Sequence, residues 1–161
     1  MLKKKRSGKK GVFAEKSFKR FETILDFSGK IYMGYQVPKV RNPKDDRFLQ
    51  IGGNKYLDPS GKFDDSFNHS CDPNAGLVIK IGKVRLMAIK NIKKGEEITW
   101  DYSTTMDENL WEMNCDCKAK NCRKRIRDFK YLEKKIQKKY ADLGIVPKYN
   151  LRYLKIELPQ I

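Results

Sequence analysis

The sequence of 161 residues lacks long apolar runs and has little histidine or cysteine, with one histidine and four cysteines in all. No stretch approaches the roughly 18 consecutive apolar residues of a membrane-spanning helix. The N-terminal segment 1–11 carries basic residues with no apolar stretch after them, so it does not resemble a secretory signal. We therefore expect an intracellular, cytoplasmic protein with no membrane partner, or a nuclear one in a eukaryotic host.

Acidic residues are also few relative to basic ones. Lys and Arg number 36 against 20 Asp and Glu, which gives a formal net charge of +16. Basic residues crowd segments 3–10 and 118–139, whereas acidic residues concentrate in segment 96–116 between them. The overall charge would attract nucleic acid, which is one candidate partner although nothing in the composition requires it. The acidic segment would instead attract a cationic substrate.

Short segments rich in β-branched and aromatic residues predict a small, mainly β domain. The chain length suits a single domain, and 39% hydrophobic residues are enough for one core. Turn residues such as Ser28-Gly29, Gly82 and Gly95 separate the segments. The predicted strand segments are 11–18, 23–33, 47–61, 76–92 and 93–103.

Only the C-terminal part has a helical period. Apolar residues recur every three or four positions between 126 and 143. Gly144 stands where a helix C-cap is expected, and Pro147 follows shortly after it. This pattern predicts one helix close to the end of the chain.

Three of the four cysteines fall in the segment CDCKAKNC, whose C-x-C-x4-C spacing is too tight for an ordinary disulfide framework. Thiolates at this spacing suit tetrahedral zinc, and a structural zinc site takes four ligands. Cys71 would complete a site of four thiolates and leave no thiol unpaired, whereas His69 is the alternative fourth ligand. The predicted ligands are Cys71, Cys115, Cys117 and Cys122.

Four segments occur in the order found in one enzyme family. They are GVFA at 11–14, NHSCDPN at 68–74, GEEITWDY at 95–102 and CDCKAKNC at 115–122. Together they resemble the SET-domain protein lysine methyltransferases that carry a post-SET zinc segment. The resemblance implies a SET (β-clip) fold in which the NHSC segment is threaded, like a knot, beneath the strand that carries WDY.

The resemblance extends from about residue 8 to residue 126 and also implies a division of the chain. Residues 127–161 have no assignment from the motifs, and we expect them to form a helical extension. The predicted parts are a basic N-terminal tail at 1–10, a SET domain at 11–105, a post-SET zinc segment at 106–126 and the extension at 127–161.

By resemblance, the protein would transfer methyl groups from S-adenosylmethionine to the side-chain amine of lysine. The Tyr102 hydroxyl would orient the amine and stabilise the developing charge, which makes Tyr102 the predicted catalytic residue. Asn68 would bind the amino-acid end of the cofactor, and the His69 backbone would contact its adenine. The predicted cofactor-binding residues are Lys10, Gly11, Val12, Phe13, Asn68, His69 and Tyr102.

The sequence departs from the family pattern at three places. Lys9-Lys10-Gly11 replaces the usual Gly-x-Gly, Ser60-Gly61 replaces a Tyr-Gly pair that lines the lysine channel, and Asp65-Ser66-Phe67 replaces Arg-Phe-Ile. We expect Trp100 to line the channel here together with Tyr56, with Tyr32 as the alternative to Tyr56. Trp100 stands where the family has Phe or Tyr, so its indole either crowds the amine pocket and limits methylation or turns into the core.

The expected partner is a lysine-containing, basic protein, histone-like if the host has histones. Two other functions are compatible with these residues. A SET-like scaffold with weak catalysis would explain Ser60 and Lys9, and a basic zinc module that binds nucleic acid would explain the charge. The cysteine cluster lacks the second Cys/His pair of a zinc finger, which argues against the last alternative.

Overall fold

Short β-strands make up most of the regular structure, as the sequence predicts. The computed structural model describes residues 2–6, 9–37, 47–80 and 82–154. Gly8 and the end of the predicted extension, 155–161, lie outside these residues. The strands are β1 (Leu2–Arg6), β2 (Lys9–Ala14), β3 (Thr23–Asp26), β4 (Ile31–Met33), β5 (Leu49–Gly52), β6 (Lys55–Leu57), β7 (Asn68–His69), β8 (Ala75–Lys80), β9 (Lys83–Ala88), β10 (Thr99–Trp100), β11 (Met113–Asn114) and β12 (Arg125–Ile126).

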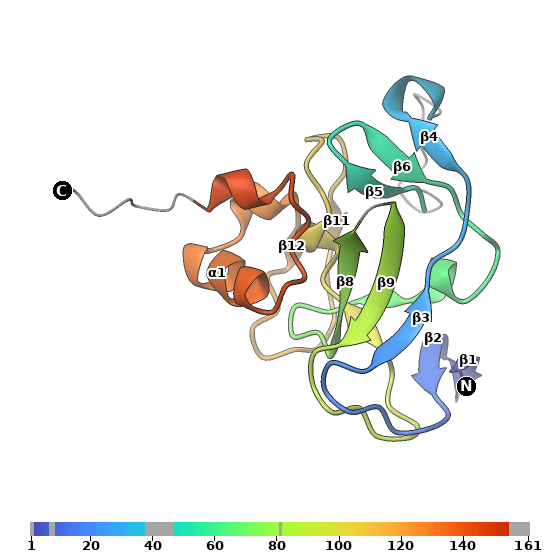
Figure 1. Ribbon diagram of the computed structural model, residues 1–161. Helices are drawn as coiled ribbons and strands as arrows, with labels where there is room; N and C mark the ends of the chain where they lie inside the picture. The colour runs from blue at the N-terminus through green and yellow to red at the C-terminus, as the bar shows by residue number, and fades with distance from the viewer. Residues whose placement is uncertain (1, 7–8, 38–46, 81, 155–161) are drawn as a thin grey trace.

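Two three-stranded antiparallel sheets form the body of the fold (Figure 1). One has the order β3-β9-β8, and its β8–β9 hairpin turns at Gly82 as expected, with φ +73°. The other has the order β4-β6-β5, with its tight turn after Gly52. The remaining strands form two-stranded pairs, namely β1 with β2, β7 with β10 and β11 with β12.

The helical segment is shorter than the apolar period predicts. The period begins at residue 126, but α1 spans only Lys134–Asp142. Leu132 and Glu133 have extended ψ angles of 146° and 141°, so the chain before α1 cannot continue as a helix. The buried Gln137 amide donates to the carbonyl groups of Phe129 and Leu132 and holds this irregular entry. Gly144 adopts φ +71° at the helix end, which confirms the predicted C-cap.

The described part of the chain has five short 3-10 helices, three between strands and two after β12, and α1 is its one α-helix. No helix among the described residues is long and apolar enough to cross a membrane. The 3-10 helices are η1 (Gly34–Gln36), η2 (Asp64–Ser66), η3 (Tyr102–Thr104), η4 (Phe129–Tyr131) and η5 (Leu151–Tyr153).

The C-terminal residues pack on the β8 side of the central sheet (Figure 1). Buried Phe129, Tyr140 and Ile145 form a second apolar cluster there, separate from the main core around Leu77 and Leu86. The part of the extension that the structure describes is therefore packed on the domain rather than a solvent-exposed appendage.

We predict that Gly76→Ala destabilises the protein. A methyl group on Gly76 would lie 2.6 Å from Ile145 Cγ2 and 2.8 Å from Cδ1, so the C-terminal cluster would have to move away from β8. Overpacking of this kind costs about 1–3 kcal/mol. Denaturant unfolding should show the loss, with Gly53→Ala as control, because no atom lies within 4 Å of a methyl group there. Equal unfolding midpoints for the two variants would contradict the packing described.

Candidate functional site

The pairing of β7 with β10 brings the NHSC and WDY segments together. The two strands are parallel, with Thr99 opposite Asn68 and Trp100 opposite His69. Beyond the strands, the Ser70 amide donates to the Trp100 carbonyl at 3.1 Å. Two segments that lie about thirty residues apart in sequence therefore form one local structure, and Tyr102 follows directly from it.

Tyr102 lies among aromatic rings beside this pair. Its ring centroid is 4.8 Å from that of Trp100, 5.3 Å from that of His69 and 6.3 Å from that of Trp111. The hydroxyl donates to the Phe67 carbonyl at 2.6 Å. Burial raises the pKa of Tyr102 far above its ordinary value, so the hydroxyl keeps its proton at neutral pH.

A cavity of about 130 Å³ opens beside Tyr102. Its lining combines aromatic rings with carboxylates, and Arg47 is the one basic residue among the described residues that line it. Such a surface favours a cationic or amphipathic side chain over an anion. The aromatic lining residues are Phe27, Phe48, Phe67, Trp100, Tyr102 and Trp111, and the acidic ones are Asp58, Asp64, Asp65 and Glu108.

The two residues predicted to line the channel differ in their placement. Trp100 is buried and lines the cavity next to Tyr102. Tyr56 is not among the lining residues, and its hydroxyl donates instead to Glu108 Oε2 at 2.7 Å. Tyr56 therefore contacts a residue that lines the cavity without lining the cavity itself. Ser60 likewise lies off the cavity, where its hydroxyl pairs with the Asp64 carboxylate.

The predicted cofactor-binding residues of β2 and β7 meet at Gly11. A methyl group on Gly11 would lie 2.7 Å from Asn68 Nδ2 and would also collide with the Glu97 carboxylate, so both side chains would have to move to admit a larger residue there. The exposed Asn68 amide donates to Glu97 Oε1 at 2.7 Å. Val12 and Phe13 are buried in β2, and Lys10 is described by its backbone alone.

Glu97 was absent from the predicted site residues. Its side chain pairs with the Asn68 carboxamide beside Gly11, and the two polar groups together suit the amino-acid end of a ligand. These are the groups that S-adenosylmethionine requires at that end, so the residues present fit this cofactor.

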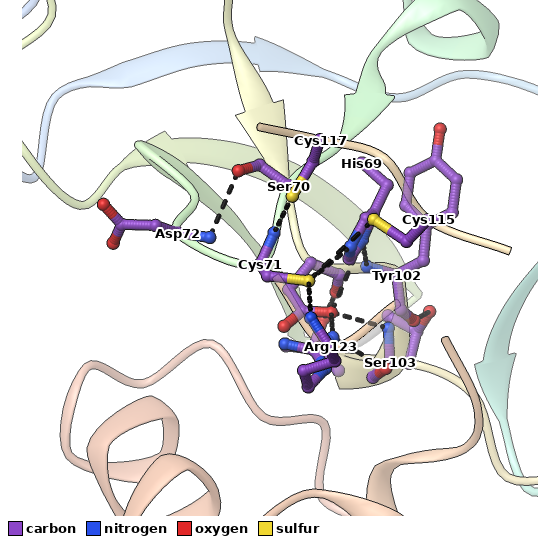
Figure 2. A network of polar contacts seen from close by, with 12 residues as sticks. His69, Ser70, Cys71, Asp72, Tyr102, Ser103, Cys115, Cys117 and Arg123 are labelled. Carbon is purple, nitrogen blue, oxygen red and sulfur yellow. Dashed lines mark hydrogen bonds and ion pairs between the residues drawn. The ribbon is translucent and has the colours of Figure 1, made fainter. Parts of the chain in front are cut away.

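The cysteine segment folds back onto the NHSC segment (Figure 2). The ligand atoms of His69, Cys71, Cys115 and Cys117 all lie within 4.8 Å of one another. The sulfur atoms of Cys71 and Cys115 are 4.0 Å apart, and the Cys71 amide donates to Cys117 Sγ at 3.4 Å. Cys122 lies beside them, with its Sγ 3.4 Å from the Cys115 carbonyl oxygen. Converging sulfur and nitrogen donors in a buried site fit zinc.

Hydrogen bonds to His69 indicate how it would take part. Burial lowers the pKa of His69 to about 4, so the imidazole is neutral near pH 7. Nδ1 accepts the Tyr102 amide at 3.2 Å, which places the remaining proton on Nε2, 3.3 Å from Cys71 Sγ. His69 in this tautomer would donate to a cysteine sulfur. The donor atoms that converge within 4.8 Å are those of His69, Cys71, Cys115 and Cys117, so the predicted set of four cysteines, with Cys122 in place of His69, stays a prediction.

The thiols differ in acidity in the absence of a metal ion. Burial raises the pKa of Cys71 to about 11 and raises that of Cys115 as well. Burial also disfavours the Cys117 thiolate, but amide donation from Cys71 and Ala119 outweighs it and lowers the pKa of Cys117 to about 6. Zinc binding would therefore release protons from the more buried thiols.

Asp101, directly before Tyr102 in the chain, is a buried carboxylate that the sequence analysis did not single out. Asp101 is 1% exposed and accepts hydrogen bonds from Arg123 Nη2 at 2.7 Å, the Ser103 amide at 3.1 Å and the Tyr140 hydroxyl at 3.0 Å. One signal was available in the sequence. In a strand, Trp100 and Tyr102 share one face, so the acid between them must point the other way, into the core.

Comparisons with known proteins agree with these motifs. A family model described as the SET domain matches residues 9–103. The chain is 30% identical over 128 residues to the variant-silencing SET domain-containing protein of Plasmodium falciparum (isolate 3D7), covering 70% of this chain and 5% of that protein. It is 28% identical over 131 residues to the probable histone-lysine N-methyltransferase set-23 of Caenorhabditis briggsae, covering 71% of this chain and 54% of that protein. The chain thus spans about half of one relative and a small part of the other.

Among solved structures, the fold is similar to that of KRYPTONITE in complex with mCHH DNA, an H3(1–15) peptide and SAH. The TM-score is 0.60 at 21% identity, and the match covers 78% of this chain and 29% of that one. This likeness confirms the predicted mainly β fold with its C-terminal helix. The knot-like threading and the division of the chain into four parts stay predictions.

We predict one zinc ion per chain in protein purified without chelator. Cys71→Ala should abolish stoichiometric zinc, because it removes a sulfur that lies within 4.8 Å of the other donors. Ser70→Ala, one residue away, should keep the metal, since the Ser70 hydroxyl accepts only the Asp72 amide among the contacts shown in Figure 2. Elemental analysis by mass spectrometry provides the measurement, and metal-free wild-type protein would refute the site.

Proposed function

Since the chain belongs to the SET-domain family, we propose that it transfers methyl groups from S-adenosylmethionine to the side-chain amine of lysine in a protein substrate. One observation carries this proposal: Tyr102 and Trp100, whose ring centroids are 4.8 Å apart, both line a cavity of aromatic and acidic residues. A lysine side chain has an apolar stem and a cationic end, and this lining suits both parts.

The residues around Gly11 would hold the cofactor. Asn68 and Glu97 offer polar side chains for its amino-acid end, and both side chains lie directly against Gly11 of β2. When bound, S-adenosylmethionine supplies a methyl group on a positively charged sulfur. None of Gly11, Val12, Phe13 or Asn68 lines the cavity, so cofactor and lysine would be held by different residues.

The cavity would prepare the lysine amine. Carboxylates such as Asp65 and Glu108 attract the cation, while the aromatic rings exclude water and favour the neutral amine that can attack. The Tyr102 hydroxyl donates its own proton to the Phe67 carbonyl, so its oxygen stays available to accept a hydrogen bond from the amine. Tyr102 would thereby direct the amine lone pair toward the methyl group.

The proposed substrate is a basic, histone-like protein. The names of relatives support this class, since set-23 is a probable histone-lysine N-methyltransferase and KRYPTONITE has been crystallised with an H3(1–15) peptide. The four carboxylates of the cavity lining would favour basic residues around the target lysine. A histone-directed enzyme would work inside the cell, and in the nucleus of a eukaryotic host.

We predict that Tyr102→Phe folds normally but loses methyl transfer. The change removes one hydroxyl from a preorganised site, and losses of about 100-fold or more are typical for such a group. Transfer of labelled methyl groups to lysine peptides, including H3(1–15), measures the effect. Tyr35→Phe is the matched control, because Tyr35 is 80% exposed. Undiminished turnover by Tyr102→Phe would show that Tyr102 is not the catalytic residue.

Trp100 should limit the number of methyl groups added. Its indole is larger than a phenyl ring and narrows the cavity beside Tyr102, so we expect the enzyme to stop at mono- or dimethyllysine. Trp100→Phe should raise the final methylation state while turnover continues. Mass spectrometry of a single-lysine peptide under saturating cofactor distinguishes the products. Ready accumulation of trimethyllysine by the unsubstituted enzyme would contradict this role.

A further inference from the structure

Asp101 caps the 3-10 turn η3, which begins at Tyr102, and holds it by hydrogen bonds. The Asp101 carboxylate accepts the Ser103 amide, and its carbonyl oxygen accepts both the amide and the hydroxyl of Thr104. The Tyr102 amide is bound to His69. These hydrogen bonds tie the amides of Tyr102, Ser103 and Thr104 to Asp101 and His69, while the carbonyl groups of the turn accept bonds from elsewhere, such as that from the Asn150 side chain to the Thr104 carbonyl.

Two segments from outside the family-model match hold the Asp101 carboxylate. Arg123, directly after the last cysteine, donates to Oδ1 at 2.7 Å (Figure 2 shows it next to Ser103). Tyr140, in α1, donates to Oδ2 at 3.0 Å. Arg123 and the Ser103 amide both bind Oδ1, so Tyr140 has the second oxygen as its acceptor.

The Tyr140 hydroxyl is not explained by packing. Its ring is 2% exposed among Phe129, Leu132 and Ile145, where phenylalanine would fill nearly the same space without a buried polar group. A hydroxyl in such a cluster is stabilising only through its partner, and here the partner is Asp101.

We propose that Tyr140 is a positioning residue for methyl transfer: through its hydrogen bond to Asp101, the C-terminal extension holds the Tyr102 hydroxyl at the cavity. This inference rests on the proposed function and assigns a catalytic purpose to the part of the chain that the motifs leave unassigned. Small displacements of a reacting group lower rates strongly, so a modest movement of the turn would slow the chemical step without changing what binds.

The test compares Tyr140→Phe with Tyr131→Phe in the full chain. Both substitutions remove one hydroxyl from the extension, but Tyr131 is 50% exposed and its hydroxyl is 3.4 Å from Asn109 Oδ1, away from Asp101. Two measurements are made on each variant. Steady-state kinetics with S-adenosylmethionine and H3(1–15) or another accepted lysine peptide gives kcat and KM. Amide hydrogen exchange of residues 102–105 reports the order of the turn without requiring activity.

We expect Tyr140→Phe to lower kcat by about tenfold, the usual scale for a residue that supports a reacting group, with KM changed less than about twofold. Exchange of the Ser103 and Thr104 amides should become faster, while zinc content stays at the wild-type level. Tyr131→Phe should match wild type in each measurement.

A wild-type kcat in Tyr140→Phe would overturn the inference, and so would unchanged amide hydrogen exchange of residues 102–105. A fall in kcat that is accompanied by an equal loss of zinc or of folded protein would also overturn it. Failure of the proposed function is a separate outcome. If the unsubstituted chain methylates no peptide, that function is wrong, and the exchange rates alone decide whether Tyr140 holds the turn.

Discussion

The parallel pairing of β7 with β10 is the constraint on which the site depends. Parallel strands need a long connection between them, and here the connection is the β8–β9 hairpin that forms one side of the central sheet. A pair of two residues is weak by itself. Asn74 secures it with its side chain, which donates to the Glu97 carbonyl at 2.8 Å and accepts the Thr99 amide at 2.9 Å. The residues that would bind cofactor, metal and lysine are therefore adjacent because one short pairing is held in register.

The buried charge at Asp101 couples this pairing to the rest of the chain. Removing one partner from a buried ion pair costs about 3–5 kcal/mol, because the remaining charge is left without compensation. The Asp101–Arg123 contact therefore ties the cysteine segment to the turn after β10. Tyr140 adds the C-terminal extension to the same carboxylate. The carboxylate next to Tyr102 thus joins the cysteine segment and the C-terminal extension to the turn after β10.

Local sequence patterns predict much of the fold and of the candidate site, whereas the features that they miss depend on contacts between residues far apart in the sequence. The hairpin turn at Gly82, the cap at Gly144 and the converging cysteines follow from residue type and spacing. The prediction that the helix begins near residue 126 is wrong for a physical reason. A 3-10 turn also places apolar residues three positions apart, so the spacing of Phe129 and Leu132 resembles that of an α-helix. The contacts of Tyr56 with Glu108 and of Tyr140 with Asp101 join residues 52 and 39 positions apart, and no local pattern contains them.

The cavity itself crosses the boundary between the family motifs and the cysteine segment. Met106, Glu108 and Trp111 line it, and all three follow the residues matched by the family model. Trp111 also belongs to the apolar cluster around Cys71, Cys115 and Ile126. Its buried indole Nε1 has no hydrogen-bond partner within the described structure. Because Trp111 packs directly on the cysteine cluster, the shape of the cavity that would receive lysine depends on the same cluster that would hold the metal, and both segments must be folded for this cavity to form.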